Sequence, residues 1–375
     1  MSERDEKGRQ ILGRSDGNAR PVTGTGRFAS QSGFTTREDL GERNPGSATL
    51  DDSMQKVAWR RRLGRPRVRS IALVVLAAIL IVPVGLFSYG WWHYSRIETV
   101  DVSSVLSGRS GRKGTNYLIV GTDSRAGIDS SDPNAGAFIA SEVSGARTDT
   151  IMILHVEDGT SQLASIPRDL WVTDPANGQK GRINSTFASG PANLILTVES
   201  IGIPVDHYLE INFLSFARLV DAVGGISVTF DNPARDTHSG LSIERAGTVR
   251  LNGSQALAYV RSRYYEEQRG GKWIVDPTSD LGRTERQRQF LTTLIKSAST
   301  ARNPLVLVRL PGAFGEGIKR DTTLSYLGAI DLVWTMKDST PASVAIPVSA
   351  RTTTGGAAVL ELKQGSSEVI QTLAK

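Results

Sequence analysis

The stretch that decides the fold is an apolar segment that runs directly into a polar motif, Tyr117-Leu118-Ile119-Val120-Gly121-Thr122-Asp123-Ser124-Arg125. Its first four residues are apolar or aromatic and end at a glycine, which predicts a short buried β-strand. Two more runs of this kind follow at 151–156 and 163–166. The polar residues begin where the first strand ends, a usual place for ligand sites in α/β proteins.

Strand-like and helix-like segments alternate beyond these runs. Helical spacing occurs at 191–201 and 213–223, and the second segment ends at Gly224-Gly225, a C-terminal stop. Further strands are expected at 226–230, 305–310, 344–348 and 359–362, and further helices at 284–299, 323–336 and 367–374. This order predicts an α/β fold, a three-layer α/β/α domain with a central mixed sheet.

An apolar run of 22 residues, 71–92, precedes the domain and carries no charged side chain. A helix rises about 1.5 Å per residue, so this run is long enough to cross a hydrocarbon core of about 30 Å. Six arginines lie before it in residues 60–69, and aromatic residues cluster at 89–94. We expect one transmembrane helix with the N-terminus in the cytoplasm. The alternatives are a buried core helix and the apolar part of a cleaved signal peptide. A core helix rarely follows six arginines, and a signal peptide does not normally begin 70 residues into the chain.

These features divide the chain into four parts. Residues 1–69, rich in Gly, Ser and charged residues, predict a disordered basic cytoplasmic tail. The membrane helix at 70–92 is followed by a polar extracytoplasmic connector at 93–114, and the catalytic domain is expected at 115–375. The protein is therefore expected in the cell membrane as a single-pass protein whose catalytic domain lies outside the cytoplasm.

Composition excludes several classes of function. The chain has no cysteine and only four histidines, no two at ligand spacing, which argues against thiolate chemistry and against a histidine-rich metal site. The formal charge of +6 arises in residues 1–69, where 15 Lys and Arg accompany 9 Asp and Glu, so we expect no nucleic acid as a partner. No P-loop, kinase motif set, GxSxG or HExxH pattern is present.

Polar motifs accompany three of the predicted strands. After the motif at 121–125 come Arg147-Thr148-Asp149-Thr150 and Ile166-Pro167-Arg168-Asp169. Each places a carboxylate near a guanidinium group where the chain enters or leaves an apolar strand. A single Asp at a strand end is more often a turn or capping residue, so each motif is a weak signal alone.

The densest cluster consists of two segments, Tyr259-Val260-Arg261-Ser262-Arg263 and Asp280-Leu281-Gly282-Arg283-Thr284-Glu285-Arg286-Gln287. In a strand, Arg261 and Arg263 would share one face. In a helix that begins near Thr284, Arg283 and Gln287 are four residues apart and can face one site. The alternative is a solvated arginine face with surface salt bridges.

The residue types agree with one another across the motifs. The planar, permanently charged arginine side chain suits phosphate oxygens. Carboxylates among several arginines fit Mg²⁺, which takes oxygen ligands and bridges protein to substrate phosphates. The sequence therefore predicts a metal–diphosphate site with Mg²⁺, or Mn²⁺ in its place.

The order of these motifs resembles that of the LytR-CpsA-Psr family. The resemblance covers about residues 116–294, and it includes Ser165-Ile166-Pro167-Arg168-Asp169, Ile183-Asn184, Asp206-His207-Tyr208 and Leu219-Val220-Asp221-Ala222-Val223-Gly224-Gly225-Ile226. A short cytoplasmic tail with one membrane span is the family's usual layout. The segment 126–146 is a departure, because it is longer than in the shortest members.

The resemblance implies a bacterial cell-wall glycopolymer ligase. Such a phosphotransferase moves a phosphoglycan from a polyprenyl-diphosphate carrier to a sugar hydroxyl of peptidoglycan. By family position, Asp123 and Asp149 would bind the metal, and Arg168, Arg261, Arg263 and Arg283 would be catalytic. The residues expected around the diphosphate are Arg125, Arg147, Arg168, Arg261, Arg263, Arg283 and Gln287.

Two further roles follow less directly. The polyprenyl chain needs an apolar groove. The candidates, although residues with this spacing are more often ordinary core, are Leu194, Ile195, Val198, Phe213, Phe216 and Leu219. The general base has two candidates, Asp169 and Asp280, and Asp169 could instead orient an arginine. Two other functions stay open: a polyprenyl-diphosphate hydrolase, in which water replaces the sugar, and a non-catalytic membrane regulator of envelope biogenesis.

Overall fold

The computed structural model describes residues 66–108, 111–123, 148–299, 312–313, 317–337 and 339–375. Residues 71–375 form one compact unit. The strand expected at 305–310 lies outside the described residues.

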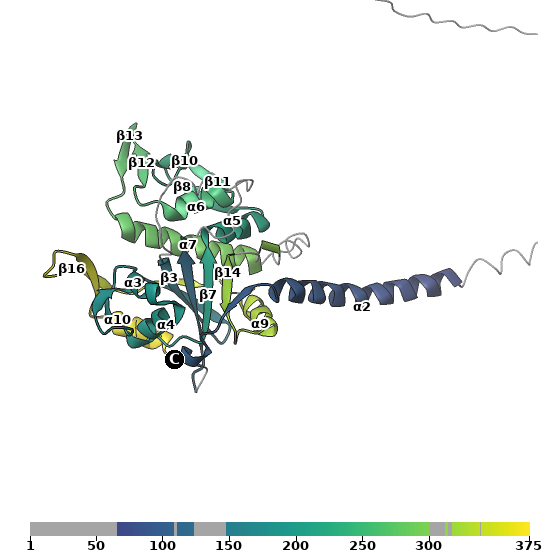
Figure 1. Ribbon diagram of the computed structural model, residues 1–375. Helices are drawn as coiled ribbons and strands as arrows, with labels where there is room; N and C mark the ends of the chain where they lie inside the picture. The colour runs from purple at the N-terminus through teal and green to yellow at the C-terminus, as the bar shows by residue number, and fades with distance from the viewer. Residues whose placement is uncertain (1–65, 109–110, 124–147, 300–311, 314–316, 338) are drawn as a thin grey trace, which may run out of the picture. The chain divides into compact units, whose positions relative to one another are not determined.

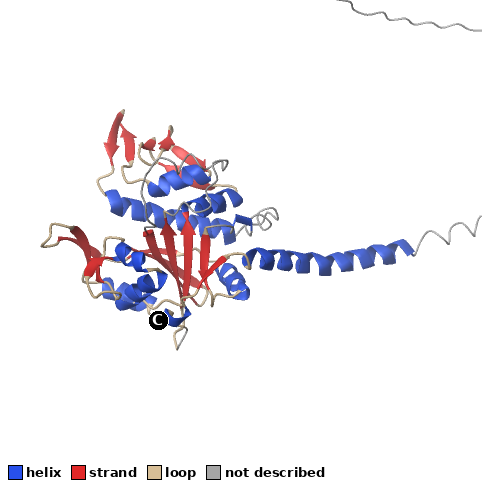
Figure 2. Ribbon diagram, viewed as in Figure 1, coloured by secondary structure: helices blue, strands red, loops and turns tan. Residues whose placement is uncertain are grey.

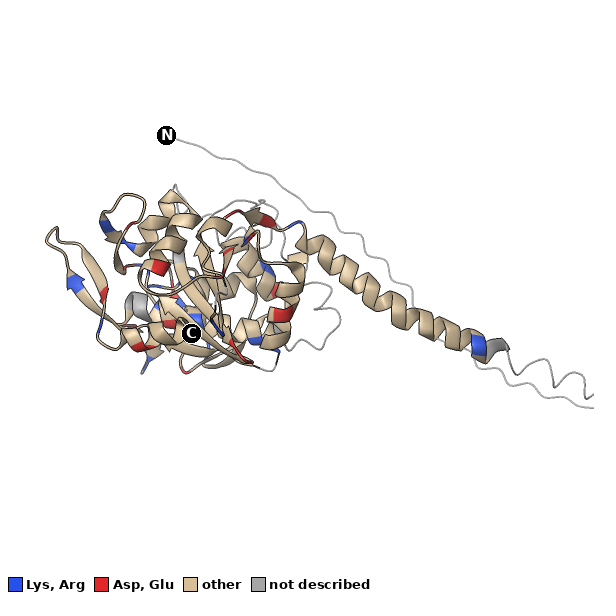
Figure 3. Cartoon of the chain, turned by 90° about the horizontal axis from the view of Figure 1, so that it is seen from below, with Lys and Arg blue, Asp and Glu red and all other residues tan. Residues whose placement is uncertain are grey.

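The chain enters this unit through a long apolar helix, α2 (Pro66–Tyr94). Among the described residues, its segment Val68–Tyr94 is the one helix that is long and apolar enough to cross a membrane. Figure 3 shows no charged residue along it except at its N-terminal end, where Arg69 lies. The helix expected at 70–92 falls within these bounds.

A seven-stranded mixed sheet forms the centre of the domain (Figures 1 and 2). Its strands, in spatial order, are β1 (Glu98–Val100), β14 (Ile318–Asp321), β7 (His207–Asn212), β2 (Thr115–Thr122), β3 (Thr148–Glu157), β4 (Thr160–Ile166) and β15 (Ala342–Ala345). β2 pairs in parallel with β7 and antiparallel with β3, and β4 pairs antiparallel with β3 and in parallel with β15. The predicted central mixed sheet is confirmed.

Helices cover both faces of this sheet. They are α3 (Ile183–Thr186), α4 (Pro191–Ser200) and α10 (Ser366–Leu373) on one face, and α7 (Ser279–Ser299) and α9 (Tyr326–Met336) on the other. Because successive strand residues point to opposite faces, Leu118 packs with Leu194 of α4, whereas Ile119 packs with Leu291 of α7. Burial on both faces explains why the central strands are continuously apolar in sequence.

A second lobe with its own core lies beyond α7 (Figure 1). It contains α5 (Phe213–Ala222), α6 (Gly253–Arg261), the pair β8 (Ile226–Phe230) and β11 (Gly247–Leu251), and a sheet of β10 (Leu241–Ile243), β9 (Ala234–Asp236), β12 (Glu266–Arg269) and β13 (Lys272–Val275). Helix α5 begins at the residue after β7, so it connects the lobe to the central sheet. The side chain of Asn212 accepts a hydrogen bond from the backbone N–H of Ser215 and caps α5.

Two hairpins and two short 3₁₀ turns complete the described chain. They are β5 (Trp171–Thr173) with β6 (Lys180–Arg182), β16 (Val348–Thr352) with β17 (Ala358–Leu362), and the turns Ser103–Val105 and Phe187–Ser189. The strand expected at 344–348 is in fact the end of β15 and the start of β16. Pro347 lies between them, where it cannot donate a ladder hydrogen bond.

The folded domain begins before the expected boundary at residue 115. Strand β1 lies within the expected connector 93–114 and pairs in parallel with β14. A three-residue edge strand is too short to give a periodic signal in the sequence, which is why the connector appeared structureless. The domain therefore starts directly after α2.

Candidate active site

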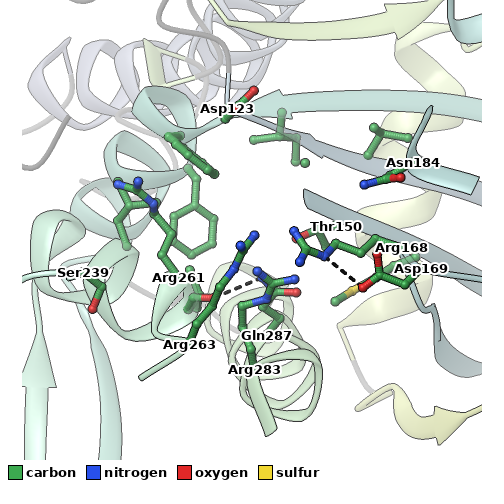
Figure 4. Close-up of a pocket in the computed structure, with 18 of the residues that line it drawn as sticks. Asp123, Thr150, Arg168, Asp169, Asn184, Ser239, Arg261, Arg263, Arg283 and Gln287 are labelled. Carbon is green, nitrogen blue, oxygen red and sulfur yellow. Dashed lines mark hydrogen bonds and ion pairs between the residues drawn. The ribbon is translucent and has the colours of Figure 1, made fainter. Parts of the chain in front are cut away.

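A cavity of about 1050 Å³ lies between the carboxyl end of β2 and the helices of the second lobe. It is at the upper end of the sizes usual for small-molecule sites. Six of the residues predicted to bind the metal or the diphosphate line it, namely Asp123, Arg168, Arg261, Arg263, Arg283 and Gln287. They come from segments that are far apart in the chain, and Figure 4 shows them around one space.

The C-terminal end of α6 supplies Arg261, and the loop that follows supplies Arg263. This segment is helical rather than extended, because Asn252 and Gln255 form a capping box that starts α6. The two arginines therefore reach the cavity from a helix end and a loop, not from one face of a strand. The guanidinium group of Arg261 lies 4.7 Å from the ring centroid of Phe213, which orients it across the cavity wall.

The first turns of α7 supply Arg283 and Gln287, which are one turn apart as expected. The Nε2 atom of Gln287 donates to the carbonyl oxygen of Val260, 3.0 Å away, and so ties α7 to the end of α6. Arg283 is only 3% exposed. Its charge is largely withdrawn from bulk water, so its attraction for a phosphate is less screened than it would be at the surface.

A buried carboxylate, Asp236 at the end of β9, holds the loop that carries Arg263. Its Oδ2 atom accepts hydrogen bonds from the Ser262 hydroxyl at 2.7 Å, from the Arg263 N–H at 3.0 Å and from the Tyr264 N–H at 2.9 Å. Its Oδ1 atom accepts from the His238 N–H at 2.8 Å. Burial alone would raise the pKa of Asp236, but these hydrogen bonds together lower it.

Sequence reasoning missed Asp236, because a single carboxylate after a three-residue strand has no motif signature. The residues that follow it, His238 and Ser239, also line the cavity. A carboxylate that collects several donors at once fixes the loop geometry, so Asp236 sets where Arg263 enters the site.

The remaining arginine of this motif, Arg286, is directed elsewhere. Its guanidinium group donates to Asp276 at 2.8 Å and to the carbonyl oxygen of Ser262 at 2.9 Å, and it lies 4.5 Å from the Tyr265 ring centroid. Burial would raise the pKa of Asp276, but hydrogen bonds from Thr278 and Arg286 lower it. Arg286 therefore supports the wall of the site from behind.

The opposite side of the cavity is formed by strand ends. Arg168 and Asp169 lie in the loop after β4, with Arg168 Nε 3.5 Å from one Asp169 oxygen and Arg182 Nε 3.3 Å from the other. The backbone N–H of Asn184 donates to the Arg168 carbonyl oxygen at 3.1 Å. Asp169 thus lies between two arginines, which matches the orienting role considered for it.

Asp123 lines the cavity at the end of β2, and in Figure 4 it lies apart from the labelled arginines. Arg125 and Arg147 lie outside the described residues, as do the side chains of Asp149 and Asp280. Among the described residues, no group of three or more His, Asp or Glu side chains is arranged to hold a metal.

The backbone nevertheless places the two predicted metal ligands on adjacent strand ends. β2 and β3 pair antiparallel, and the register shifts between Gly121, which pairs with Thr150, and Thr122, which pairs with Thr148. Asp149 is therefore the extra residue of a β-bulge in β3. The bulge lies beside the end of β2, whose last residue, Thr122, directly precedes Asp123. Aspartates at two neighbouring strand ends, one of which, Asp123, lines the cavity, fit the oxygen ligands that Mg²⁺ prefers.

The apolar part of the cavity differs from the expected lipid groove. Phe213 and Phe216 line it, together with Ile119, Ile211, Leu257 and Leu291. The other candidates are core residues: Leu194, Ile195 and Val198 are fully buried between α4 and the sheet, and Leu219 packs in a separate core cluster. Helical spacing could not separate the two cases, because α4 and α5 both present an apolar face to a core.

Comparison with known proteins connects this chain to one family. The model of the LytR_cpsA_psr family matches residues 90–375. The chain is 36% identical over 232 residues to the probable cell wall biosynthesis protein LcpB of Corynebacterium glutamicum. The aligned region covers 61% of this chain and 52% of LcpB. The chain thus spans about half the length of that relative.

Two further proteins are similar over more of their own length. The polyisoprenyl-teichoic acid–peptidoglycan teichoic acid transferase TagU of Halalkalibacterium halodurans is 30% identical over 272 residues, covering 68% of this chain and 81% of TagU. The solved structure of a LytR-Csp2A-Psr enzyme from Actinomyces oris superposes with a TM-score of 0.59 at 24% identity, covering 74% of this chain and 96% of that one. The latter supports the fold.

Proposed function

The chain belongs to the LytR-CpsA-Psr family, and on this premise we propose that it is a phosphotransferase of cell-wall assembly. It moves a phosphoglycan from a polyprenyl-diphosphate carrier to a sugar hydroxyl of peptidoglycan, with Mg²⁺ at the diphosphate. The name of the H. halodurans relative supports this proposal, because it describes a transferase with a polyisoprenyl-linked donor and a peptidoglycan acceptor.

The observation that carries the proposal is the convergence of four arginines on one partly apolar cavity. Arg168, Arg261, Arg263 and Arg283 come from three separate segments and line the same space. Charges of one sign repel each other when they are brought together, so such a cluster is expected where an anion of several charges binds. A diphosphate supplies that charge, and two oxygens of one phosphate can accept hydrogen bonds from the planar guanidinium fork of one arginine.

In the proposed reaction, the acceptor hydroxyl oxygen attacks the phosphorus that carries the glycan. A new bond forms between that oxygen and phosphorus, the bond to the bridging oxygen breaks, and polyprenyl phosphate leaves with the electron pair. The hydroxyl proton passes to solvent or to a carboxylate. The arginines stabilise charge on the transferred group and on the leaving phosphate. Mg²⁺, held by Asp123 and Asp149, would supply additional positive charge at the diphosphate.

The apolar residues of the cavity give the carrier a place to bind. Phe213 and Phe216 lie next to the arginine cluster, so the first isoprene units can contact them while the diphosphate contacts the guanidinium groups. Helix α2 keeps the enzyme in the membrane that holds the carrier. The arginines before α2 favour a cytoplasmic N-terminus, which places the domain outside the cytoplasm, where peptidoglycan lies.

The test uses the full-length protein in liposomes with a synthetic polyprenyl-diphosphate glycan, Mg²⁺ and peptidoglycan fragments. The proposal predicts polyprenyl phosphate together with glycan joined to peptidoglycan through a phosphodiester, which mass spectrometry detects. Release of free glycan phosphate without attachment would identify a hydrolase instead. Donor that stays intact under all conditions would support a non-catalytic regulator.

A further inference from the structure

Helix α9 exposes apolar side chains on the face opposite to its buried one. Leu332 and Met336 pack into the domain core, whereas Leu327, Val333 and Trp334 are 66%, 55% and 70% exposed. Together with Ile330, which is also exposed, they recur at helical spacing and form one stripe, the α9 face (Leu327, Ile330, Val333 and Trp334). A helix on the surface of a water-soluble domain normally carries polar residues there.

The first residue of α9 contacts the membrane helix itself. The ring of Tyr326 lies 5.1 Å from that of Phe87 and 5.3 Å from that of Tyr94, and its hydroxyl donates to the Phe87 carbonyl oxygen at 3.3 Å. Gly90 allows this approach, because a Cβ there would lie 2.2 Å from the Tyr326 hydroxyl. Figure 1 shows α9 beside the C-terminal end of α2.

This contact fixes the depth of α9 relative to a bilayer. Phe87 lies five residues before Trp92, where the apolar run ends, which is about 7 Å along the helix axis. If α2 crosses the membrane, Phe87 is at the level of the acyl chains, and so is the side chain of Tyr326. The rest of α9 then begins at the boundary between acyl chains and headgroups.

Aromatic and basic side chains around α9 match such a boundary. The Lys337 ammonium lies 4.8 Å from the Trp334 ring centroid, Arg96 lies over Trp92 at 3.5 Å, and Arg320 lies over Tyr94. Tryptophan and tyrosine favour the headgroup level, and lysine and arginine extend from it toward phosphates. The one acidic residue of α9, Asp331, lines a different hollow with Arg112 and Lys113.

We propose that the α9 face inserts into the outer interface of the lipid bilayer as a second membrane contact. A lipid surface is the occupant that these contacts favour, because the stripe continues directly from the membrane helix and carries a tryptophan–lysine pair at its end. A single helix leaves a domain free to rotate about it. The second contact fixes which side of the domain meets the lipid, and thereby the path of the carrier to the cavity. This inference rests on α2 crossing the membrane and not on the transfer chemistry.

The chain contains no cysteine, so single cysteines can be introduced for site-specific labelling. Full-length Ile330→Cys and Trp334→Cys proteins in liposomes would carry an environment-sensitive fluorophore. The matched control is Ile274→Cys, because Ile274 is an exposed isoleucine on β13 of the second lobe, and Leu80→Cys within α2 is the reference for a membrane position. Quenching by nitroxide on lipid acyl chains would be compared with quenching by aqueous iodide.

The inference predicts that labels at Ile330 and Trp334 emit at shorter wavelength and are quenched by the lipid nitroxide, whereas the label at Ile274 is quenched by iodide only. Iodide quenching at both α9 positions, with Leu80 still quenched from the lipid, would overturn it. Protection from both quenchers would mean that a second protein copy covers the face, which also overturns it. Loss of lipid quenching at Leu80 would overturn the membrane span together with this inference. Transfer activity plays no part in the readout, so the proposed function is tested separately.

Discussion

The two walls of the cavity differ in how their charged side chains are held. On the helical wall (α6, the loop 262–264 and α7), buried hydrogen bonds fix the backbone behind the arginines: Asp236 accepts three bonds from the loop, and Gln287 ties α7 to α6. On the strand-end wall (the end of β2, the start of β3 and the loop 167–169), Arg168 Nε and an Asp169 carboxylate oxygen are 3.5 Å apart. That ion pair is looser than the bonds around Asp236.

This difference indicates a division of labour. Donors that are already in place need no reorganisation when charge develops, so the helical wall is suited to stabilise the transition state. The strand-end wall carries Asp123 and Asp169, and Asp123 is one of the predicted metal ligands. We therefore expect substitutions on the helical wall to affect the rate most, and substitutions on the strand-end wall to affect metal dependence.

The largest effect is expected for the arginines of the helical wall. Arg263→Ala and Arg283→Ala should each cost about 2–4 kcal/mol of transition-state stabilisation, a loss of about 30- to 1,000-fold in transfer rate. Lysine at either position should restore little, because it lacks the planar fork. Rates of phosphodiester formation measure this.

Arg269→Ala is the matched control, since Arg269 is an exposed arginine paired with Glu267 on β12, outside the cavity. It should transfer at the normal rate. Normal transfer in both cavity variants would remove these arginines from the site. Loss of folding in both would instead favour a structural salt-bridge role.

The next effect concerns Asp236, which acts through Arg263. Asp236→Asn replaces an acceptor of backbone N–H groups by an amide, and hydrogen bonds to a charged group are worth about 1.5–3 kcal/mol. The free energy of unfolding should fall. In the Asp236→Asn background, Arg263→Ala should reduce the transfer rate by a smaller factor than in wild type, because the loop is already displaced. A double-mutant cycle on transfer rates measures this.

Asp174→Asn is the control, because Asp174 accepts a backbone N–H bond from Ala176 in a turn outside the cavity. Its effect should simply add to that of Arg263→Ala. If Asp236→Asn is also additive with Arg263→Ala, Asp236 stabilises the lobe without positioning the arginine.

A third carboxylate, Asp321 at the end of β14, lies outside both walls and tests stability without catalysis. Burial would raise its pKa, but hydrogen bonds from His207, Thr323 and the Tyr208 N–H lower it to about 2. Because the native state favours the ionised form, Asp321 adds about 2 kcal/mol to the free energy of unfolding at pH values above its pKa in the unfolded chain. This contribution is lost as the pH falls from about 4 to 2.

Asp321→Asn should therefore destabilise the protein at neutral pH while transfer by the folded fraction continues. Urea unfolding of the two proteins should differ most at pH 7 and converge near pH 2. A stability difference that does not change with pH would contradict the assigned pKa shift.

The smallest effect is expected on metal coupling at the strand-end wall. If Asp123 and Asp149 hold Mg²⁺, metal and lipid diphosphate should each increase the affinity for the other by about fivefold or more. Asp123→Ala and Asp149→Ala should weaken this coupling, as Mg²⁺ titrations at fixed lipid diphosphate would measure. A wild-type response in both variants, or a change in thermal stability alone, would place the ion elsewhere.

The sequence allowed the fold class to be predicted because the central strands are buried on both faces. The runs at 117–120 and 151–156 are continuously apolar for that reason. Helix α5 ends just before Gly224 and Gly225, as the sequence predicted. Most of the second lobe was not predicted, since strands such as β9 and β10 have three residues each. Short strands take their stability from tertiary contacts and leave no periodic pattern.

The site, like the fold, has features that the sequence predicted and features that it did not. Arginines at strand and helix ends were predictable from residue type and from the family resemblance, which is confirmed. The conformation of 259–263 depended on the capping box at Asn252, and the role of Asp236 depended on contacts 26 to 28 residues away in sequence. Neither the loop geometry nor the separation of core from groove residues follows from local sequence.

The most direct test of the central claim is the affinity of the full-length protein for a short lipid diphosphate. Isothermal titration of wild-type and Arg263→Ala protein with farnesyl diphosphate and with farnesyl monophosphate, at fixed Mg²⁺, separates charge recognition from lipid binding. We expect wild type to bind the diphosphate more tightly than the monophosphate, and Arg263→Ala to lose most of this preference. Equal affinity of wild type for both ligands, or a preference that survives in Arg263→Ala, would contradict this expectation.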